Sequence, residues 1–244
     1  PDPGYPDYLS GVSLGRVTYE TFPLTAENDF LPDLDAIPEE TARRAKFIYI
    51  NYPNNPTGAV ATKAFYEKLV AWAKTYEVGV VSDLAYGALG YRGYENPSFL
   101  STPGAKDVGI EFYTFSKTFN MAGWRLAFAA GNEQMIEALN LIQDHLFVGI
   151  FPALQEAGIA ALLDPKSEEA VAQLNATYDS RRDAFVQAAA KIGWQAFLSR
   201  GSFYAWMPVP EGYTSESFAD LLLEKAHVAV APGKGFGPAG DAYV

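Results

Sequence analysis

Two short apolar runs on either side of an amphipathic pattern constrain the fold of this chain more than any other feature. Residues 46–50 and 78–82 are rich in β-branched and aromatic side chains, which is typical of buried strands. Between them, residues 62–77 carry apolar side chains at helical spacing: Phe65, Leu69, Trp72 and Tyr76. A strand, a helix and a second strand in this order predict a crossover unit, and therefore a parallel sheet.

Further patterns extend this sheet and then give way to long helices. Strands are predicted over residues 108–115 and 126–130. Helices are predicted over residues 133–146, 152–163, 168–191 and 215–226. Shorter strands are predicted around the last helix, over residues 194–198, 201–207 and 227–230. The first 45 residues are rich in Pro and Gly, and they predict loops with a short strand around residues 12–19.

These elements predict an α/β fold with a mainly parallel sheet sandwiched by helices, followed by a smaller α+β domain. We expect the large domain to span residues 1–160 and the small one residues 161–244, with the helix at 168–191 as a bridge. We also expect the aromatic stretch 146–151 to pack at the start of the helix that follows it.

Charge and composition exclude several classes of function. The 18 basic and 29 acidic residues give a net charge of 18 − 29 = −11, so we expect no nucleic-acid partner. The absence of cysteine excludes a disulfide, a zinc–thiolate site and a thiol nucleophile, and the two histidines lack the spacing of metal ligands. We expect no metal site. No run approaches the roughly 18 apolar residues of a membrane span, so a cytoplasmic location is the default expectation.

Both ends of the sequence look interrupted. Residues 1–8 form a turn-rich stretch with no initiator Met, and residues 240–244 end on an apolar pair typical of a strand that is just beginning. We therefore expect this chain to be the central part of a longer protein.

Four stretches carry residues suited to chemistry. One is the rigid turn at residues 2–8, which presents Tyr5 and Tyr8 and on its own is equally consistent with a surface turn. The other three each follow a predicted strand. Residues 54–58 read Asn-Asn-Pro-Thr-Gly, which alone is equally typical of a turn. Residues 82–86 read Ser-Asp-Leu-Ala-Tyr, where the acid could simply cap a helix. Residues 114–125 contain Lys117 directly after a strand and Arg125 at the start of the next. In open α/β sheets, ligands collect at the carboxyl ends of the strands.

Lys117 is the most informative of these residues. It follows an apolar strand and is flanked by Ser116 and Thr118, whereas most lysines lie on polar helix faces. A desolvated amine is a nucleophile suited to Schiff-base chemistry. Arg125 offers a planar guanidinium for a phosphate group. The competing interpretation is a buried lysine that pairs with a carboxylate.

A lysine, an acid, a cation and an aromatic wall are the parts that a pyridoxal phosphate site requires. In this order and spacing, the chain resembles the class I/II aminotransferases among the fold-type I pyridoxal phosphate enzymes. It matches their Asn-Pro-Thr-Gly, Asp-x-x-Tyr and Ser-x-x-Lys…Arg signatures over essentially its whole length. The residues after the lysine are most similar to bacterial diaminopimelate, alanine and aspartate aminotransferases.

The resemblance implies a role for each matching residue. Lys117 would form the internal aldimine with pyridoxal 5′-phosphate and move a proton during amino transfer between an amino acid and a 2-oxo acid. Asp83 would face the pyridine nitrogen. The remaining cofactor-binding residues would be Tyr5 over the ring, Asn55 and Tyr86 at the 3′ oxygen, and Thr114, Ser116 and Arg125 around the phosphate. Asn55 would also contact the substrate, and the resemblance implies a homodimer.

Departures from the family pattern limit the resemblance. Thr114 stands where the family usually has Ser, which keeps the hydroxyl but adds a methyl group. The family's glycine- and serine-rich phosphate loop would precede Pro1, and its carboxylate-binding arginine would follow Val244. A chain of this extent alone would retain the cofactor poorly.

Other functions remain open at this stage. A carbon–sulfur β-lyase would use the same Lys117, Asp83 and Arg125, and an aminotransferase-like domain could also serve as the ligand sensor of a transcription regulator. Residues 235–240 match the dinucleotide pattern G-x-G-x-x-G, but Pro238 interrupts them and no predicted helix follows. We therefore expect a loop there.

Overall fold

The computed structural model describes residues 1–197 and 199–244, and backbone contacts group them into two compact units. Unit 1 comprises residues 1–33, 54–59 and 180–244. Unit 2 comprises residues 34–53 and 60–179. The division at residues 160 and 161 that the sequence suggests stays a prediction.

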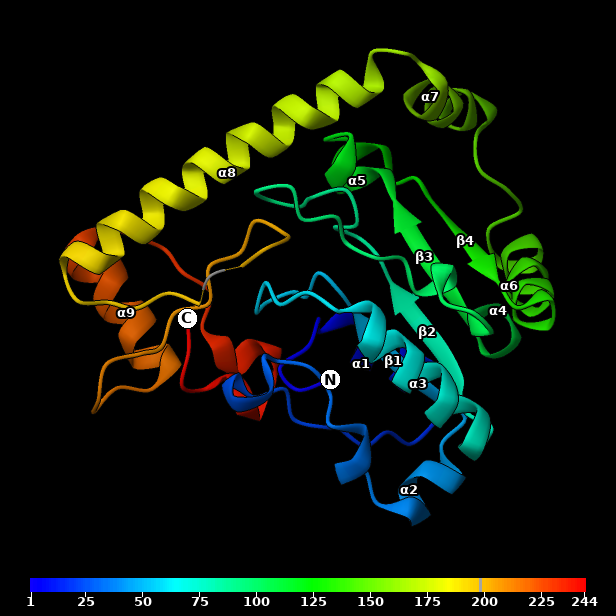
Figure 1. Ribbon diagram of the computed structural model, residues 1–244, viewed down its shortest axis with the longest axis horizontal. Helices are drawn as coiled ribbons and strands as arrows, with labels where there is room; N and C mark the ends of the chain where they lie inside the picture. The colour runs from blue at the N-terminus through cyan, green and yellow to red at the C-terminus, as the bar shows by residue number, and fades with distance from the viewer. Residues whose placement is uncertain (198) are drawn as a thin grey trace. The chain divides into compact units, whose positions relative to one another are not determined.

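Unit 2 is built on a four-stranded sheet in the order β1-β2-β3-β4 (Figure 1). Its strands are β1 (Phe47–Asn51), β2 (Gly79–Asp83), β3 (Gly109–Thr114) and β4 (Ala127–Gly131). The first three are parallel, and β4 runs antiparallel to β3. This arrangement confirms the predicted mainly parallel sheet, and each strand lies within one residue of its predicted bounds.

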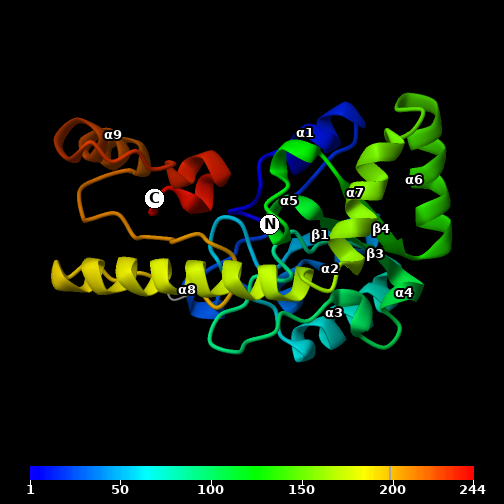
Figure 2. The ribbon, with the colours of Figure 1, turned by 90° about the horizontal axis from the view of Figure 1, so that it is seen from above.

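Helices flank this sheet on both sides. Figure 2 shows α3 (Lys63–Tyr76) and α4 (Ala105–Val108) on one side of the strands and α6 (Glu133–Leu146) on the other. The side chain of Thr62 accepts a hydrogen bond from the Phe65 N–H and so begins α3, which buries its apolar face against the sheet. The remaining helices of this part are α2 (Glu39–Arg44), α5 (Phe115–Thr118) and α7 (Pro152–Leu163).

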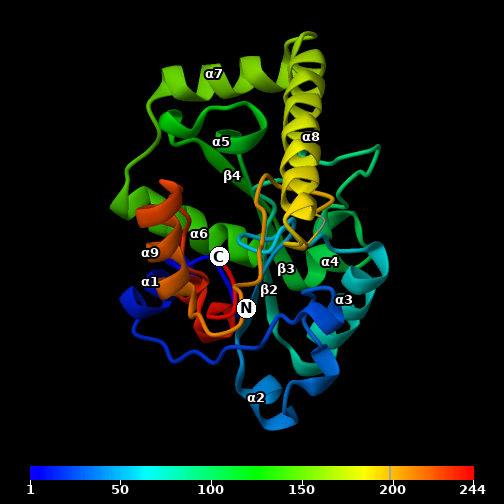
Figure 3. The ribbon, with the colours of Figure 1, turned by 90° about the vertical axis from the view of Figure 1, so that its left-hand side faces the viewer.

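Helix α8 (Ser167–Lys191) contributes residues to both units, and the chain turns sharply between α7 and α8 (Figure 3). Unit 1 also contains α1 (Asp7–Leu14) and α9 (Ser215–Ala226). Its core is a cluster of buried apolar side chains: Ala189, Met207, Phe218, Ala219 and Val244. The rings of Trp206 and Tyr243 stack beside it, with centroids 5.0 Å apart. No helix of the described residues is long and apolar enough to cross a membrane.

The predicted strands of the C-terminal part are wrong for the described residues, and Leu198 of the first one lies outside them. Met207 and Val244 exchange backbone hydrogen bonds of 2.9 Å, and the Val209 N–H donates to the Ala242 carbonyl. These bonds form an isolated antiparallel bridge between Pro208 and Tyr243. An extended apolar segment forms a strand only where a neighbouring segment continues its backbone hydrogen bonds. The pairing of residues 207–209 with residues 242–244 is too short for that.

Two smaller expectations are also wrong. Residues 12–14, predicted as part of a short strand, belong to α1, and residues 16–19 are irregular. The stretch 146–151 does not pack at the start of α7, because Leu146, Phe147, Val148 and Phe151 are all at least 69% exposed.

Candidate active site

The carboxyl ends of β2 and β3 lie at the same edge of the sheet, because the two strands are parallel and paired in register. Asp83 is the last residue of β2 and pairs with Phe112 of β3, and Thr114 is the last residue of β3. This edge is where open α/β sheets bind ligands. Six of the eight predicted site residues belong to this part of unit 2: Asp83, Tyr86, Thr114, Ser116, Lys117 and Arg125.

Helix α5 places Lys117 directly after β3. The hydroxyl of Thr114 accepts a hydrogen bond of 3.2 Å from the Ser116 N–H and caps the helix. At the other end, the Tyr113 hydroxyl donates a 2.6 Å hydrogen bond to Thr118. Burial raises the pKa of Tyr113, so its phenol stays protonated. These bonds fix the short turn that carries the lysine.

The amine of Lys117 lies over the ring of Tyr86, with Nζ 5.8 Å from the ring centroid. This separation is within the range of a cation–π interaction. Tyr86 is only 4% exposed and comes from the loop that follows β2. The structure therefore brings together a lysine and a phenol that lie 31 residues apart in the sequence (117 − 86 = 31).

Asp83 lies at the beginning of the same loop. Its Oδ1 accepts a 3.2 Å hydrogen bond from the Ala85 N–H, and its side chain is half-buried. The backbone carbonyl of Asp83 accepts a 2.9 Å hydrogen bond from the side chain of Asn51 on β1. The carboxylate is thus presented at the strand end by a local turn and a cross-strand contact.

Arg125 reaches the same edge because β4 is antiparallel to β3. The Phe115 N–H donates to the Leu126 carbonyl at 3.1 Å and joins the start of β4 to the end of β3. Arg125 itself has a left-handed backbone, with φ at 52°, and an exposed side chain that donates to the Ala122 carbonyl. Thr114 and Ser116 lie shortly before Arg125 in the sequence, and the Thr114 hydroxyl donates a 3.0 Å hydrogen bond to the Ser116 hydroxyl.

The other two predicted residues, Tyr5 and Asn55, belong to unit 1. Tyr5 is 40% exposed and packs against the edge of the Tyr8 ring. Asn55 is buried in a turn that Asn54 organises, since Asn54 Oδ1 accepts hydrogen bonds from the N–H and the hydroxyl of Thr57. These bonds explain why Asn54 and Thr57 suit this turn, and Gly58 supplies the positive φ of 73° that follows them.

The chemistry of the donor set at the sheet edge fits pyridoxal phosphate. An aldehyde needs an amine, a pyridine nitrogen needs an acid, and a phosphate needs hydroxyls and a cation. Lys117, Asp83, Thr114, Ser116 and Arg125 supply these groups, and Tyr86 adds a phenol beside the amine.

Two alternative sites do not fit. Across residues 1–197 and 199–244, no group of three or more His, Cys, Asp or Glu side chains could hold a metal ion. The glycine-rich residues 235–240 lie in two short 3₁₀ turns, Gly233–Phe236 and Pro238–Gly240, and no α-helix begins there. A dinucleotide phosphate requires the N-terminus of such a helix.

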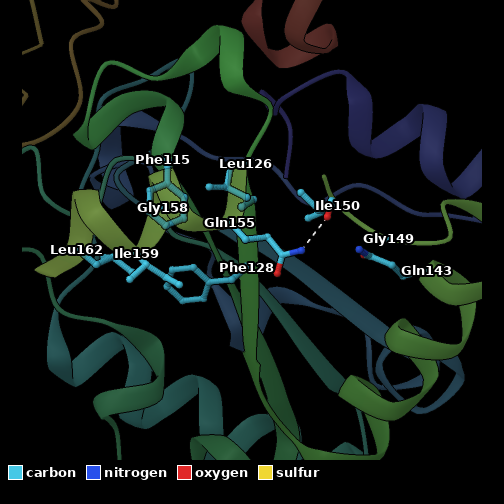
Figure 4. A pocket seen from close by; sticks show the side chains of 11 residues that line it. Phe115, Leu126, Phe128, Gln143, Gly149, Ile150, Gln155, Gly158, Ile159 and Leu162 are labelled. Carbon is cyan, nitrogen blue, oxygen red and sulfur yellow. Dashed lines mark hydrogen bonds between the residues drawn. The ribbon is translucent and has the colours of Figure 1, made fainter. Parts of the chain in front are cut away.

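A cavity of about 370 Å³ lies elsewhere, on the β4 side of unit 2 (Figure 4). Its lining is mainly apolar and includes Phe115, Phe128 and Ile159. The side chain of Gln155 is turned toward the backbone of Ile150 and donates a 2.7 Å hydrogen bond to its carbonyl. None of the eight predicted site residues lines this cavity, but Phe115 and Leu126 of its lining are chain neighbours of site residues.

Reasoning from the sequence missed Glu111, a buried carboxyl in the middle of β3. It accepts hydrogen bonds from Ser82, Ser98 and the Phe99 N–H. Burial raises the pKa of this carboxyl, and the hydrogen bonds oppose the shift. A single acid within the apolar run at residues 108–115 is the signal that could have identified it.

Comparisons with known proteins identify the family of this chain. A family model described as aminotransferase class I and II matches residues 1–241. The chain is 57% identical to L-glutamine–4-(methylsulfanyl)-2-oxobutanoate aminotransferase of Bacillus subtilis and 50% identical to LL-diaminopimelate aminotransferase of Moorella thermoacetica. In both matches the whole chain aligns with 61–62% of the relative's length, so the chain spans about three fifths of these proteins.

Solved structures show the same similarity. A substrate-bound structure of BacF from Bacillus subtilis superimposes with a TM-score of 0.95 at 47% identity, and covers 100% of this chain and 62% of that one. An aminotransferase from Staphylococcus aureus gives a TM-score of 0.95 at 40% identity, over 100% of this chain and 64% of its own.

Proposed function

Because this chain belongs to the aminotransferase class I and II family, whose members use pyridoxal 5′-phosphate, we propose that the protein transfers an amino group between an amino acid and a 2-oxo acid. One observation carries the proposal. The amine of Lys117 lies over the Tyr86 ring, at the sheet edge where Asp83 ends β2. An amine, a phenol and a carboxylate at one strand edge are the groups that this chemistry needs.

When bound, pyridoxal phosphate supplies an aldehyde for the amine and a ring that withdraws electrons from the substrate's Cα. Lys117 would bind the aldehyde carbon and, once released, would accept and return the proton at the substrate's Cα. The Asp83 carboxylate would hold a proton on the ring nitrogen. At 4 Å and an effective dielectric constant of 20, such an ion pair is worth about 4 kcal/mol.

The other residues would bind and orient the cofactor. Tyr86 would donate its phenol proton to the 3′ oxygen, and Arg125 would pair with the phosphate, which the hydroxyls of Thr114 and Ser116 would also bind. For unit 1 we propose that Asn55 binds the 3′ oxygen and the substrate, and that Tyr5 covers the ring. The partial exposure of Tyr5 supports its role, because a ring face must be available to stack.

The names of the relatives suggest the first substrates to test. The Bacillus subtilis relative is named for L-glutamine and 4-(methylsulfanyl)-2-oxobutanoate, and the Moorella relative for LL-diaminopimelate. We propose that the amino donor is one of these two amino acids. Incubating the protein and cofactor with each donor and a panel of 2-oxo acids should yield the matching amino acids. Pyruvate release from a sulfur amino acid without any transfer would instead indicate a β-lyase.

We further propose that the protein is a cytoplasmic homodimer with no nucleic-acid partner. Large apolar side chains are exposed along α6, α7 and the segment between them: Leu141, Ile142, Leu146, Phe147, Val148, Phe151, Ile159, Leu162 and Leu163. An exposed apolar surface of this kind is typical of a subunit interface. Sedimentation equilibrium should give twice the monomer mass, and a monomer would contradict the proposal. Cell fractionation tests the location.

A further inference from the structure

Glu111 is a buried carboxylate that the proposed mechanism does not use. Its side chain is in the middle of β3, and the residue is 6% exposed. Oε2 accepts hydrogen bonds from the Phe99 N–H at 2.8 Å and from the Ser82 hydroxyl at 3.0 Å, and Oε1 accepts one from the Ser98 hydroxyl at 2.5 Å. Burying a carboxylate costs free energy unless hydrogen-bond donors replace the lost water, and these three donors do so.

The three donors lie at the two ends of one segment. Ser82 is the register partner of Glu111 on β2 and immediately precedes Asp83. Ser98 and Phe99 lie where the loop after β2 ends and the 3₁₀ turn Phe99–Ser101 begins. Tyr86 lies on the loop between these points. One carboxylate therefore joins both ends of the segment that carries Asp83 and Tyr86 to β3, an inner strand of the sheet.

Within the segment, side chains bind backbone carbonyls in place of regular secondary structure. Asn96 donates to the carbonyls of Gly87 and Leu89, at 3.1 and 2.9 Å, and closes the loop on itself. The Tyr94 hydroxyl donates to the Ala61 carbonyl, and Asn175 of α8 donates to the Ala88 carbonyl. These bonds set the shape of the loop, whereas the bonds to Glu111 tie its two ends to β3.

We propose that Glu111 is a positioning residue that holds the ends of residues 83–98 and thereby fixes Asp83 and Tyr86 toward the cofactor. The link to the cofactor rests on the proposed function, but the hold on the loop does not. Glu111→Ala would leave the buried Phe99 N–H and Ser82 hydroxyl and the half-buried Ser98 hydroxyl without this acceptor, and would remove the side-chain contacts that tie both ends of the loop to β3. Glu111→Gln would keep one carbonyl oxygen as acceptor, and its NH₂ group would donate to Ser98, whose hydroxyl can accept as well as donate.

The first arm of the test measures the loop in the cofactor-free protein. Hydrogen exchange followed by mass spectrometry would be compared for wild type, Glu111→Ala, Glu111→Gln and Glu67→Ala, an exposed glutamate of α3 that serves as the control. Glu111→Ala should speed exchange in peptides from residues 84–97 by about tenfold or more, while β1 and α6 stay unchanged. The Gln and control variants should stay near wild type. Uniform acceleration, or none in the loop, would overturn the proposal.

The second arm measures the consequence for the cofactor. Glu111→Ala should weaken pyridoxal phosphate binding and move the pH at which its visible absorbance changes, and Glu111→Gln should restore both. A loosened loop with unchanged cofactor affinity and absorbance would overturn the positioning role.

If wild type itself fails to bind the cofactor, the proposed function fails, while the hydrogen-exchange arm still tests whether Glu111 holds the loop. If Glu111→Ala does not fold, Ser98→Ala removes one of the three donors and should give the same changes in smaller measure.

Discussion

At the scale of single residues, the account depends most on Lys117. Its side chain is half-buried and lies over Tyr86, on a turn fixed by Thr114 and Thr118. The lysine could be identified from the sequence because it stands in an apolar context and its neighbours match a family signature. The structure adds the nearby phenol and the bonds that hold the turn.

Replacing Lys117 with Ala should lower the rate of amino transfer by about 10⁴-fold or more, because no other amine would carry the proton at the substrate's Cα. The variant should still bind pyridoxal phosphate, but without a covalent bond. Steady-state kinetics and dialysis of the loaded protein check both points. Lys63→Ala, at an exposed lysine of α3, is the matched control and should retain full activity. Comparable activity in the Lys117 variant would contradict its assigned role.

Glu111 provides a prediction about pH. Burial raises its pKa above the ordinary value of 4.5, so the folded state binds this proton more tightly than the unfolded state does. The resulting contribution to stability is complete below pH 4.5 and is lost as the pH rises through the folded-state pKa. Tyr66, whose phenol faces this carboxyl, stays neutral because burial raises its pKa as well.

Glu111→Gln has no such proton to lose. The free energy of unfolding of the variant, relative to wild type, should therefore rise as the pH increases above 4.5. Urea unfolding at several pH values measures this difference. A difference that stays constant across the range would show that the carboxyl titrates alike in the folded and unfolded states.

At the scale of elements, the sequence predicts the parts of the chain that have a strong period. The sequence predicts strands β1 to β4 and helices α3, α6, α7, α8 and α9 with nearly the observed bounds, because each contains a run of apolar residues typical of a strand or a helix. Helix α1 was missed because its stretch is rich in Gly and Ser. The C-terminal strands were predicted wrongly because pairing depends on partners that a local pattern does not reveal.

The candidate site likewise contains some features that the sequence predicts and others that it does not. Signatures within one turn, such as Asn54 to Gly58, are visible in the sequence because their side chains bond to their own backbone. The role of Glu111 is not visible, because Ser82, Ser98 and Phe99 meet it only after β2 and β3 have paired.

The loop at residues 233–240 provides a prediction at this scale. The Phe236 carbonyl accepts a 2.8 Å hydrogen bond from the Gly4 N–H, and Asp2 accepts one from the Ala239 N–H, so this loop binds the turn just before Tyr5. Gly237 has φ at 131°, and a Cβ there would collide with the Asp2 carboxylate. Gly237→Ala should cost about 1–3 kcal/mol of stability.

Gly235 is the matched control, because a Cβ at that position meets nothing within 4 Å. Gly235→Ala should change the stability by no more than about 0.5 kcal/mol. Chemical denaturation of the two variants tests the comparison. Equal losses would show that the contact with Asp2 does not determine the need for glycine at 237.

At the scale of the whole molecule, composition excludes several kinds of function but does not identify the one that the protein has. A net charge of −11 and the absence of cysteine removed several classes of partner and chemistry, yet neither feature points to an aminotransferase. The family emerges from the order of short signatures along the chain and from the sheet edge at which the fold places most of them. The grouping of residues 54–59 with the N- and C-terminal parts could not be predicted, because it arises from contacts distant in sequence.

The central claim is that Lys117 binds pyridoxal phosphate, and chemical trapping tests it most directly. The full-length protein would be incubated with the cofactor, reduced with borohydride, digested and mapped by mass spectrometry. We expect a stable pyridoxyl group on Lys117 in wild type and none at this position in Lys117→Ala. A pyridoxyl group on a different lysine, or no covalent product in wild type, would contradict it.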